Sequence, residues 1–252
     1  NNEQQHYTDR LDNSYVEDGN LHVVAKREVF ADLNVIKPFT SARLNSKFAF
    51  TYGRVVARAI MPTGVGTWPA IWMLGKNITE NGGYWAEEFG TTGWPACGEI
   101  DIMEHWGSNQ NIISAALHTP SSSGATENYG TIFDSDVSEE YHNYEMIWTP
   151  TEIEFYLDGV NYYTYAPEVQ NMDTWPYIAD QYLLINIALE QFVEEAFQES
   201  EMIMDYIRVY QEAGTLSAES VERKDLKIYP NPADEFVIVE AEDTNPNAQV
   251  EV

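Results

Sequence analysis

Three acids lie close together in the stretch GEIDIMEHWG (98–107): Glu99, Asp101 and Glu104. A regular strand would put the first two on one face and Glu104 on the other, because successive side chains alternate. A β-bulge at Ile102–Met103 would insert one extra residue and return Glu104 to the face of the other two acids. The alternative is a regular strand with Glu104 on the opposite face, which would then also have to be exposed to solvent.

The bulged arrangement would let the acids work as a pair. Glu99 and Glu104 would lie roughly 13 Å apart between Cα atoms, at ~3.3 Å per residue. Their carboxyls could then approach to ~5 to 6 Å, near the spacing of retaining glycosidases. Clustered acids also push their pKa values apart, so that one stays protonated while another is ionised.

Two other interpretations of these acids remain open. The first is a solvated acidic strand, against which the apolar Ile100, Ile102 and Met103 argue. The second is a metal site, since three carboxylates suit calcium. Calcium loops are usually rich in Gly, Asn and Asp, whereas these acids alternate with apolar residues.

Strands are the elements that would hold this stretch. Ile153, Phe155 and Leu157 alternate with polar residues, and Asp158-Gly159 then predicts a tight hairpin turn. Further runs typical of strands are 21–25, 49–60, 70–74, 112–117, 145–148, 162–165, 182–188 and 202–210. Only the acidic stretch 190–199 suggests a short helix. Many strands separated by turns predict an all-β sandwich or jelly roll over residues 1–211.

Composition excludes some classes of partner. The formal net charge is -28, from 41 acidic and 13 basic residues, so nucleic acid and anionic membrane surfaces are poor partners. A neutral polysaccharide is easier to reconcile with this charge. The aromatic share of 13% suits a carbohydrate site and a large β core equally well. No apolar run reaches the length of a membrane span, so we expect no membrane insertion.

Two further features concern cysteine and the end of the chain. The single Cys97 excludes an intrachain disulfide, and we expect it to be a small buried core residue. Residues 212–225 are polar and are predicted to form a linker. Residues 226–252 hold one turn and one strand, and the roughly forty residues after Gln211 are too few for an independent core.

Several motifs occur in the order found in one known family. They are WPAIWML (68–74), WPACGEIDIMEHWG (94–107), ALHT (116–119), HNYEMIWTPTEIEFYLDG (142–159) and MDYIRVYQ (204–211). Together they resemble glycoside hydrolase family 16, and within it the bacterial laminarinases. The resemblance covers nearly all of residues 1–211. It implies a concanavalin A-like β-jelly-roll sandwich with a concave substrate cleft, and endo-acting, retaining hydrolysis of internal β-1,3-glucosidic bonds in laminarin-type glucans.

The resemblance also implies roles for particular residues. Glu99 corresponds to the nucleophile, Glu104 to the general acid and then base, and Asp101 to an assistant that orients Glu99. No cofactor is implied for catalysis. The residues that resemble substrate-binding positions are Asn2, Arg43, Trp68, Trp72, Trp94 and His118. For each Trp a core position is an equally good interpretation, and for Arg43 a structural ion pair is the alternative.

Other implied features lie outside the cleft. His142 is expected to brace the end of a strand. The backbone oxygen of Gly19 and the side chain of Asp205 match a structural calcium site, whose further ligand would lie upstream of Asn1. The family's first strand would also precede Asn1, so we expect a trimmed chain.

The stretch KIYPNPA (227–233) resembles the opening of C-terminal sorting domains in secreted Bacteroidetes proteins. We therefore expect a secreted or cell-surface-attached protein, and we expect it to be a monomer.

Two departures from the family affect substrate preference. The run Ala188 to Phe192 stands where a Gly-Gly turn is usual, and the additional segment 76–93 is expected to shape a rim of the cleft. The alternative functions are a mixed-linkage β-1,3-1,4-glucanase or an agarase on the same scaffold, and a non-catalytic glucan-binding module. Such binding modules typically lose the catalytic acids, whereas this chain has all three.

Overall fold

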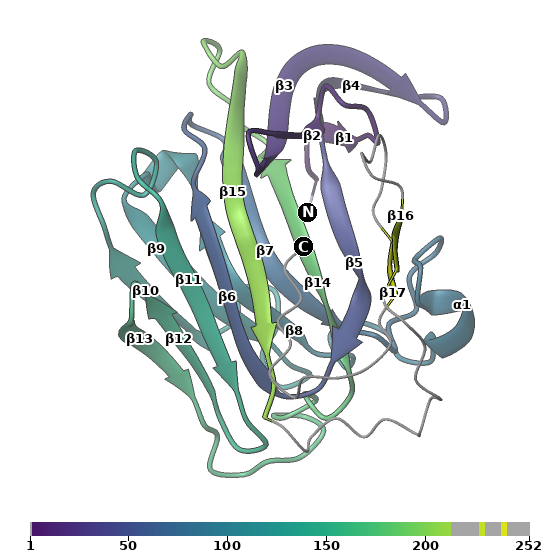
Figure 1. Ribbon diagram of the computed structural model, residues 1–252, viewed down its shortest axis with the longest axis vertical. Helices are drawn as coiled ribbons and strands as arrows, with labels where there is room; N and C mark the ends of the chain where they lie inside the picture. The colour runs from purple at the N-terminus through teal and green to yellow at the C-terminus, as the bar shows by residue number, and fades with distance from the viewer. Residues whose placement is uncertain (1, 213–226, 230–237, 241–252) are drawn as a thin grey trace.

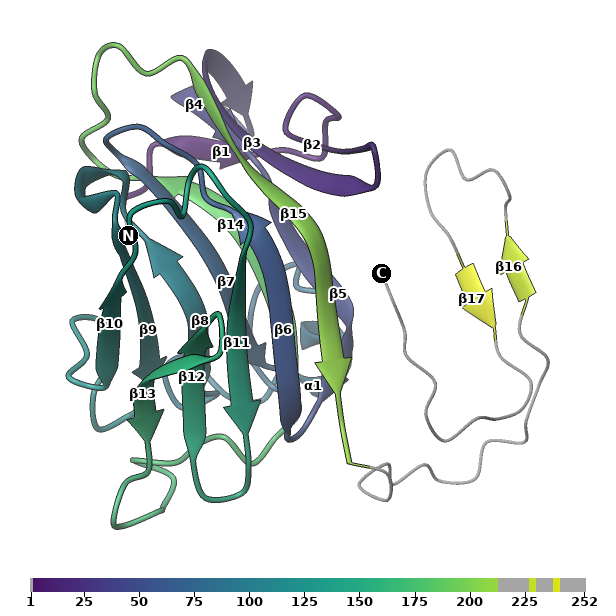
Figure 2. The same ribbon diagram turned by 60° about the vertical axis from the view of Figure 1, so that its left-hand side comes forward.

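Two large β-sheets packed face to face make up residues 2–212. The computed structural model describes residues 2–212, 227–229 and 238–240. Figure 1 shows the curved sheets as two layers, and in Figure 2 the edge formed by β10 (Tyr129–Phe133) and β13 (Val160–Tyr165) comes forward. The prediction of an all-β jelly-roll sandwich is confirmed.

The larger sheet has nine strands. Its order is β1 (Gln5–Tyr7), β4 (Val35–Ser41), β3 (Asn20–Asp32), β15 (Glu199–Tyr210), β6 (Gly53–Ile60), β11 (His142–Trp148), β12 (Ile153–Leu157) and β13, with β2 (Ser14–Glu17) paired to β3. Only β1 and β4 pair in parallel among these strands. The β3–β4 hairpin arches over one end of the sandwich (Figure 1).

The smaller sheet has six strands and carries the acids. Its order is β10, β9 (Ile112–His118), β8 (Glu99–His105), β7 (Thr67–Gly75), β14 (Gln181–Leu189) and β5 (Arg43–Phe50). The acids lie on β8, between β7 and β9 and away from the edges of the sheet. A short helix, α1 (Ala86–Phe89), lies in the connection from β7 to β8, and the single turn η1 (Gly107–Asn109) follows β8.

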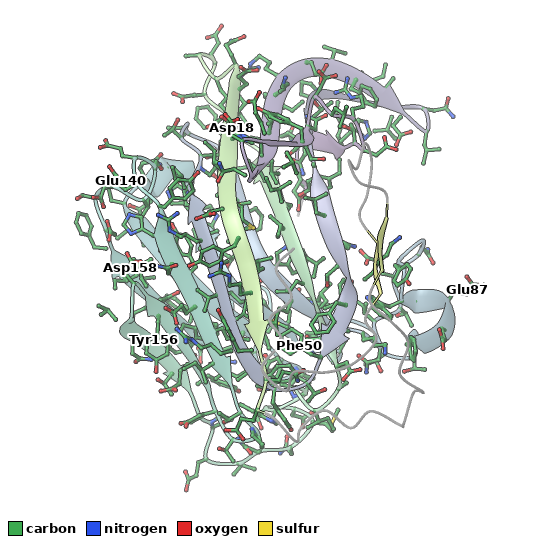
Figure 3. The ribbon with its side chains drawn as sticks, in the orientation of Figure 1. Asp18, Phe50, Glu87, Glu140, Tyr156 and Asp158 are labelled. Carbon is green, nitrogen blue, oxygen red and sulfur yellow. The ribbon has the colours of Figure 1, made fainter. Side chains whose placement is uncertain are left out.

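The core lies between the two sheets. Ile153, Phe155 and Leu157 point into it, as their alternation predicted, and Trp148 and Tyr144 of the neighbouring strand are fully buried. Burying one such side chain stabilises the fold by about 1.5–3 kcal/mol. The same alternation puts Tyr156 on the outer face, where Figure 3 labels it together with Asp158. Cys97 is buried, as expected.

Turns explain where the predicted strands end. Asp158 and Gly159 both have positive φ angles, 47° and 78°, which confirms the predicted hairpin turn. The run 49–60 is two strands, because β5 ends at Phe50 and β6 begins at Gly53. A side chain at Gly53 would come within 2.5 Å of the Tyr210 carbonyl oxygen, so only glycine fits this turn.

The prediction of a short helix at 190–199 is wrong. These residues form bends that lead into β15, and the helix is α1 instead. Arg27 of β3 explains part of the difference, because its guanidinium donates to the backbone oxygens of Phe197 and Glu194. The Phe197 oxygen therefore has a tertiary partner, and the Glu194 oxygen has one in addition to a single local turn bond from Phe197 N at 3.1 Å.

The end of the chain is described only in part. β16 (Lys227–Tyr229) pairs antiparallel with β17 (Ile238–Glu240). The predicted linker at 212–225, apart from Glu212, and the remainder of 226–252 lie outside the described residues. Among the described helices, none is long and apolar enough to cross a membrane.

Candidate active site

A β-bulge on β8 brings the three acids to one face. Between Asp101 and Glu104 the chain advances three residues, while the partner strand β9 advances two, from Ala116 to Ser114. The predicted bulge at Ile102–Met103 is thus confirmed. Both bulge side chains lie in the core, 1% and 0% exposed, which leaves Glu104 on the same side as the other two acids.

All three acids line one hollow on the smaller sheet, which we call the cleft. Its lining residues come from the N-terminal segment and from β5, β7, β8 and β14: Glu3, Tyr7, Arg43, Trp68, Ala70, Trp72, Glu99, Asp101, Glu104, Asn186 and Ala188. Three of the predicted substrate-binding residues, Arg43, Trp68 and Trp72, are therefore in the cleft wall. Both aromatic and acidic groups face the same space.

Glu99 is held by groups on both sides of its carboxyl. Trp94 Nε1–H donates to Oε2 at 2.9 Å, and Oε1 lies 3.4 Å from His118 Nε2. The Tyr177 hydroxyl bonds to the backbone oxygens of Glu99 and His118, at 3.2 and 3.0 Å, and so joins β8 to β9. Burial raises the pKa of Glu99 to about 8, and the charge of Asp101 adds to this rise, while His118 and Trp94 oppose it.

Glu104 has a similar indole partner. Trp68 Nε1–H donates to Oε1 at 2.9 Å. The Trp68 ring stacks on Trp106, with the ring centroids 5.9 Å apart, so its position is fixed. Burial raises the pKa of Glu104 above its ordinary range, and the Trp68 hydrogen bond and His118 oppose the rise. The raised pKa favours the protonated form, which is the form that a general acid needs.

Asp101 is the most buried of the three acids. It is 4% exposed, and its Oδ2 lies 3.2 Å from His118 Nε2 but makes no hydrogen bond to any described residue. Burial, followed by the charge of Glu104, raises its pKa well above the ordinary value. Asp101 therefore holds a proton more readily than an exposed aspartate, which limits the repulsion among the acids. Donor atoms of Glu99, Asp101 and His118 lie within 4.8 Å of one another, so they could also hold a metal ion.

The other end of the cleft contains a hydrogen-bonded chain. Trp72 Nε1–H donates to Asn186 Oδ1 at 2.7 Å, and Asn186 Nδ2–H donates to the Tyr7 hydroxyl at 3.0 Å. Arg43 lies over the Trp72 ring, 5.0 Å from its centroid, and forms an ion pair with Glu80 at 3.0 Å. Arg43 thus has the structural ion pair and also lines the cleft.

The remaining predicted sugar-binding residues lie at the margins. Trp94 is 47% exposed and touches the cleft through Glu99. Asn2 is exposed and has a positive φ of 58°. It precedes Glu3 and is not among the lining residues. Sugar binding by these residues stays a prediction.

The predicted calcium ligands lie on the larger sheet. Met204 pairs with Leu21, which places Asp205 across from the turn that holds Gly19; Figure 3 labels Asp18 on this turn. Arg58 binds Asp205 Oδ2 at 2.6 Å. Calcium takes six to eight oxygen ligands, so one carboxylate shared with a guanidinium and one backbone oxygen do not complete a site. The calcium site stays a prediction.

Sequence reasoning did not single out Glu3, Tyr7 and Asn186 as cleft residues. Asn186 had a usable signal, since it is the one amide inside the apolar run YLLINIAL, and every residue of β14 is buried. A polar side chain there needs a partner. Glu3 and Tyr7 lie in a polar stretch with no periodicity, and only tertiary contacts bring them to the cleft.

Comparisons with known proteins agree with this geometry. The model of glycosyl hydrolases family 16 matches residues 1–208. The chain is 34% identical over 226 residues to a beta-glucanase of Rhodothermus marinus, covering 83% of this chain and 74% of that protein. It is also 34% identical to a glucan endo-1,3-beta-glucosidase of Cryptopygus antarcticus, covering 80% and 75%.

A solved structure is similar over the same region. A variant of LamA from Zobellia galactanivorans, in complex with laminaritriose and laminaritetraose, superposes with a TM-score of 0.77 at 41% identity. The superposition covers 84% of this chain and 86% of that one. Bulged acids in a cleft, the two-layered fold and these matches lead to one conclusion: the chain belongs to glycosyl hydrolase family 16.

Proposed function

We propose that this protein is a retaining endo-1,3-β-glucanase that cleaves laminarin-type glucans. One observation carries the proposal: the bulge on β8 puts Glu99 and Glu104 in the same cleft, each with its carboxyl bound by an indole N–H. The relatives support this activity, since they include an endo-1,3-β-glucosidase and a LamA variant with bound laminaritriose and laminaritetraose.

Two carboxyls account for the reaction. Glu104 gives its proton to the glycosidic oxygen as the bond from that oxygen to the anomeric carbon breaks. Glu99 attacks the same carbon and forms a covalent glycosyl-enzyme. Glu104 then removes a proton from water, the water oxygen attacks the anomeric carbon, and the bond to Glu99 breaks. Two displacements at one carbon retain its configuration.

Charge in the cleft must be divided so that Glu99 is ionised. Asp101 and Glu104 are the more deeply buried acids, and burial raises the pKa of each. Burial and the charges of Asp101 and Glu104 raise the pKa of Glu99 to about 8, and a proton on each of those two acids would remove the repulsion that disfavours ionisation of Glu99. His118 and the Trp94 N–H lower the pKa of Glu99 relative to burial alone, and so favour the ionised nucleophile.

The substrate is a neutral polymer that lies along the cleft. Trp68 and Trp72 offer faces on which sugar rings stack, and a net charge of -28 repels sulfated chains. The same proposal includes a secreted or surface-attached location, a monomeric state and a structural calcium ion. Sedimentation and the effect of chelators on the melting temperature test the last two.

The test is reducing-sugar release from laminarin, lichenan, agarose and carrageenan, with Glu104→Ala in parallel. We expect release from laminarin by the unaltered protein and none by the variant. Preferential release from lichenan would establish mixed-linkage cleavage, and preferential release from agarose would establish an agarase. Binding of laminarin without release from any polymer would contradict the enzyme and favour a glucan-binding module.

A further inference from the structure

The connection from β7 to β8 is a closed segment that reaches the cleft. In this segment (76–93) the backbone oxygen of Asn77 accepts hydrogen bonds from Thr91 N and Thr92 N, at 2.9 and 3.0 Å. Ile78 is 8% exposed and packs beside Leu74, Cys97, Tyr182 and Leu184. The two ends of the segment are therefore joined to each other, and Ile78 packs the start of the segment on the smaller sheet.

One side chain of this segment points back to the cleft wall. Glu80 Oε1 lies 3.0 Å from Arg43 Nη2, and Oε2 accepts a hydrogen bond from the Tyr182 hydroxyl at 3.3 Å. The two side chains of the ion pair are 31% and 24% exposed. Because both oxygens of the carboxylate have partners, its orientation is fixed, and it in turn orients the guanidinium.

Arg43 has few other restraints. Its Nε has no hydrogen-bond partner among the described residues, and its carbon Cζ lies 5.0 Å from the centroid of the Trp72 ring. Arg43 and Trp72 both line the cleft. Glu80 therefore holds a cation above an indole at a place where a sugar chain would pass.

This contact lies some distance from the bond to be cleaved. Arg43 is on β5, which is separated from β8 by β7 and β14. Three strand spacings of ~4.8 Å put the two strands about 14 Å apart. The Arg43 side chain lies over Trp72 at the far side of the hollow, so a longer sugar chain would contact it more fully than a short one bound at the acids.

We propose that Glu80 is a positioning residue that determines the preference for substrate length, by fixing Arg43 over Trp72 as a wall for distal glucose units. The inference rests on the proposed glucanase activity of the same cleft. Without Glu80 the guanidinium samples other rotamers, and long substrates lose part of their binding free energy. Short substrates, which contact this wall less, lose less of their binding free energy.

The test compares Glu80→Ala with Glu87→Ala on laminaritriose and laminarihexaose. Glu87 lies on α1 in the same segment and is exposed, as Figure 3 shows, so its removal changes the charge equally without touching Arg43. For Glu80→Ala we expect KM for the hexaose to rise roughly two- to fivefold, the range of a partly exposed ion pair. The kcat for both substrates should stay unchanged, and the KM for the triose should rise less than the KM for the hexaose. Glu80→Gln, which keeps one acceptor oxygen but loses the charge, should lie between.

Affinity for laminarihexaose is measured in parallel by calorimetry on the Glu104→Gln background, so that binding is read without turnover. The inference is overturned if Glu80→Ala and Glu87→Ala behave alike, or if kcat falls equally for both substrates, as a loss of structure would cause. Failure of the proposed function looks different: the unaltered protein would then cleave neither substrate, while the calorimetric comparison would still report on Glu80.

Discussion

His118 and His142 both lie among acidic side chains, yet only His118 contacts acids that line the cleft. His118 Nε2 is 3.2 Å from Asp101 and 3.4 Å from Glu99. His142 lies 2.7 Å from Asp158, 3.4 Å from Asp136 and 3.8 Å from Asp134. In each group, three donor atoms lie within 4.8 Å of one another. Distances alone do not distinguish the two groups.

Burial distinguishes them. The side chains of Asp101 and Glu99 are 5% and 17% exposed, whereas those of Asp134, Asp136 and Asp158 are 26%, 48% and 44% exposed. In the cleft, loss of water is the largest cause of the raised pKa values. Around His142, the pKa of Asp136 is raised mainly because its protonated carboxyl donates a hydrogen bond to Asp134.

The His142 group has a structural role, as expected for a residue that braces a strand end. Asp158, in the turn between β12 and β13, binds His142 at the start of β11 and also accepts a hydrogen bond from Asn143 N at 2.8 Å. A histidine–carboxylate cluster is typical of a reactive site when burial shifts the pKa values of its acids and one side remains open to substrate. Substitutions in the two clusters should therefore have different effects on activity and on stability.

Glu104→Gln should lower kcat on laminarin by roughly 10²- to 10⁴-fold, the usual contribution of a general acid. Asp158→Asn alters the other cluster and should leave kcat within about twofold, since it lies outside the cleft. Steady-state hydrolysis of laminarin measures both. Equal losses in the two variants would remove the distinction between the clusters.

Asp158→Asn should instead lower the free energy of unfolding by roughly 1–2 kcal/mol, because it weakens the hydrogen bond to the buried His142. The effect is not larger because the Asp158 carboxyl is partly exposed and solvent screens its charge. The melting temperature should fall by about 2–4 °C for each kcal/mol in a domain of this size. Calorimetry at pH 7 measures the change, with Asp173→Asn as a charge-matched control. An unchanged melting temperature would show that His142 is not braced by Asp158.

Asp101→Asn should raise stability, whereas Asp158→Asn lowers it. Burial raises the pKa of Asp101 in the folded protein above its pKa in the unfolded chain. The contribution of this carboxyl to the free energy of unfolding is therefore full below the unfolded-state pKa and is lost as the pH rises through the folded-state pKa. Asparagine does not ionise, so the variant should gain roughly 1 kcal/mol relative to the unaltered protein between pH 5 and pH 8. Denaturant unfolding at several pH values measures this gain. A difference that does not grow with pH would mean that Asp101 is not strained by burial.

His118→Asn should shift a pH profile by a small amount. The charge of His118 lowers the pKa of Glu99, so its loss raises that pKa, and Glu99 ionises only at higher pH. The acidic limb of kcat/KM should therefore move up by roughly half a pH unit. His142→Asn should leave the limb in place. A shift to lower pH in the His118 variant would contradict the assigned electrostatics.

Some of this molecule could be predicted from sequence because its signals are local. Alternation predicted β12, Asp-Gly predicted the turn after it, and the out-of-phase Glu104 predicted the bulge. The acidic run 190–199 misled because Arg27 supplies tertiary partners for its carbonyl oxygens. No pattern within the chain relates Glu80 to Arg43, since that contact depends on how the segment 76–93 closes.

The central claim is that Glu99 attacks the anomeric carbon while Glu104 supplies the proton. A 2-deoxy-2-fluoro laminaribioside with an activated leaving group tests it, because the fluorine slows breakdown of the glycosyl-enzyme. Mass spectrometry of the intact protein and its peptides should show one added disaccharide, bound to Glu99 in the peptide that spans β8. A label on Glu104 or Asp101, or a product with inverted configuration and no adduct, would contradict the account.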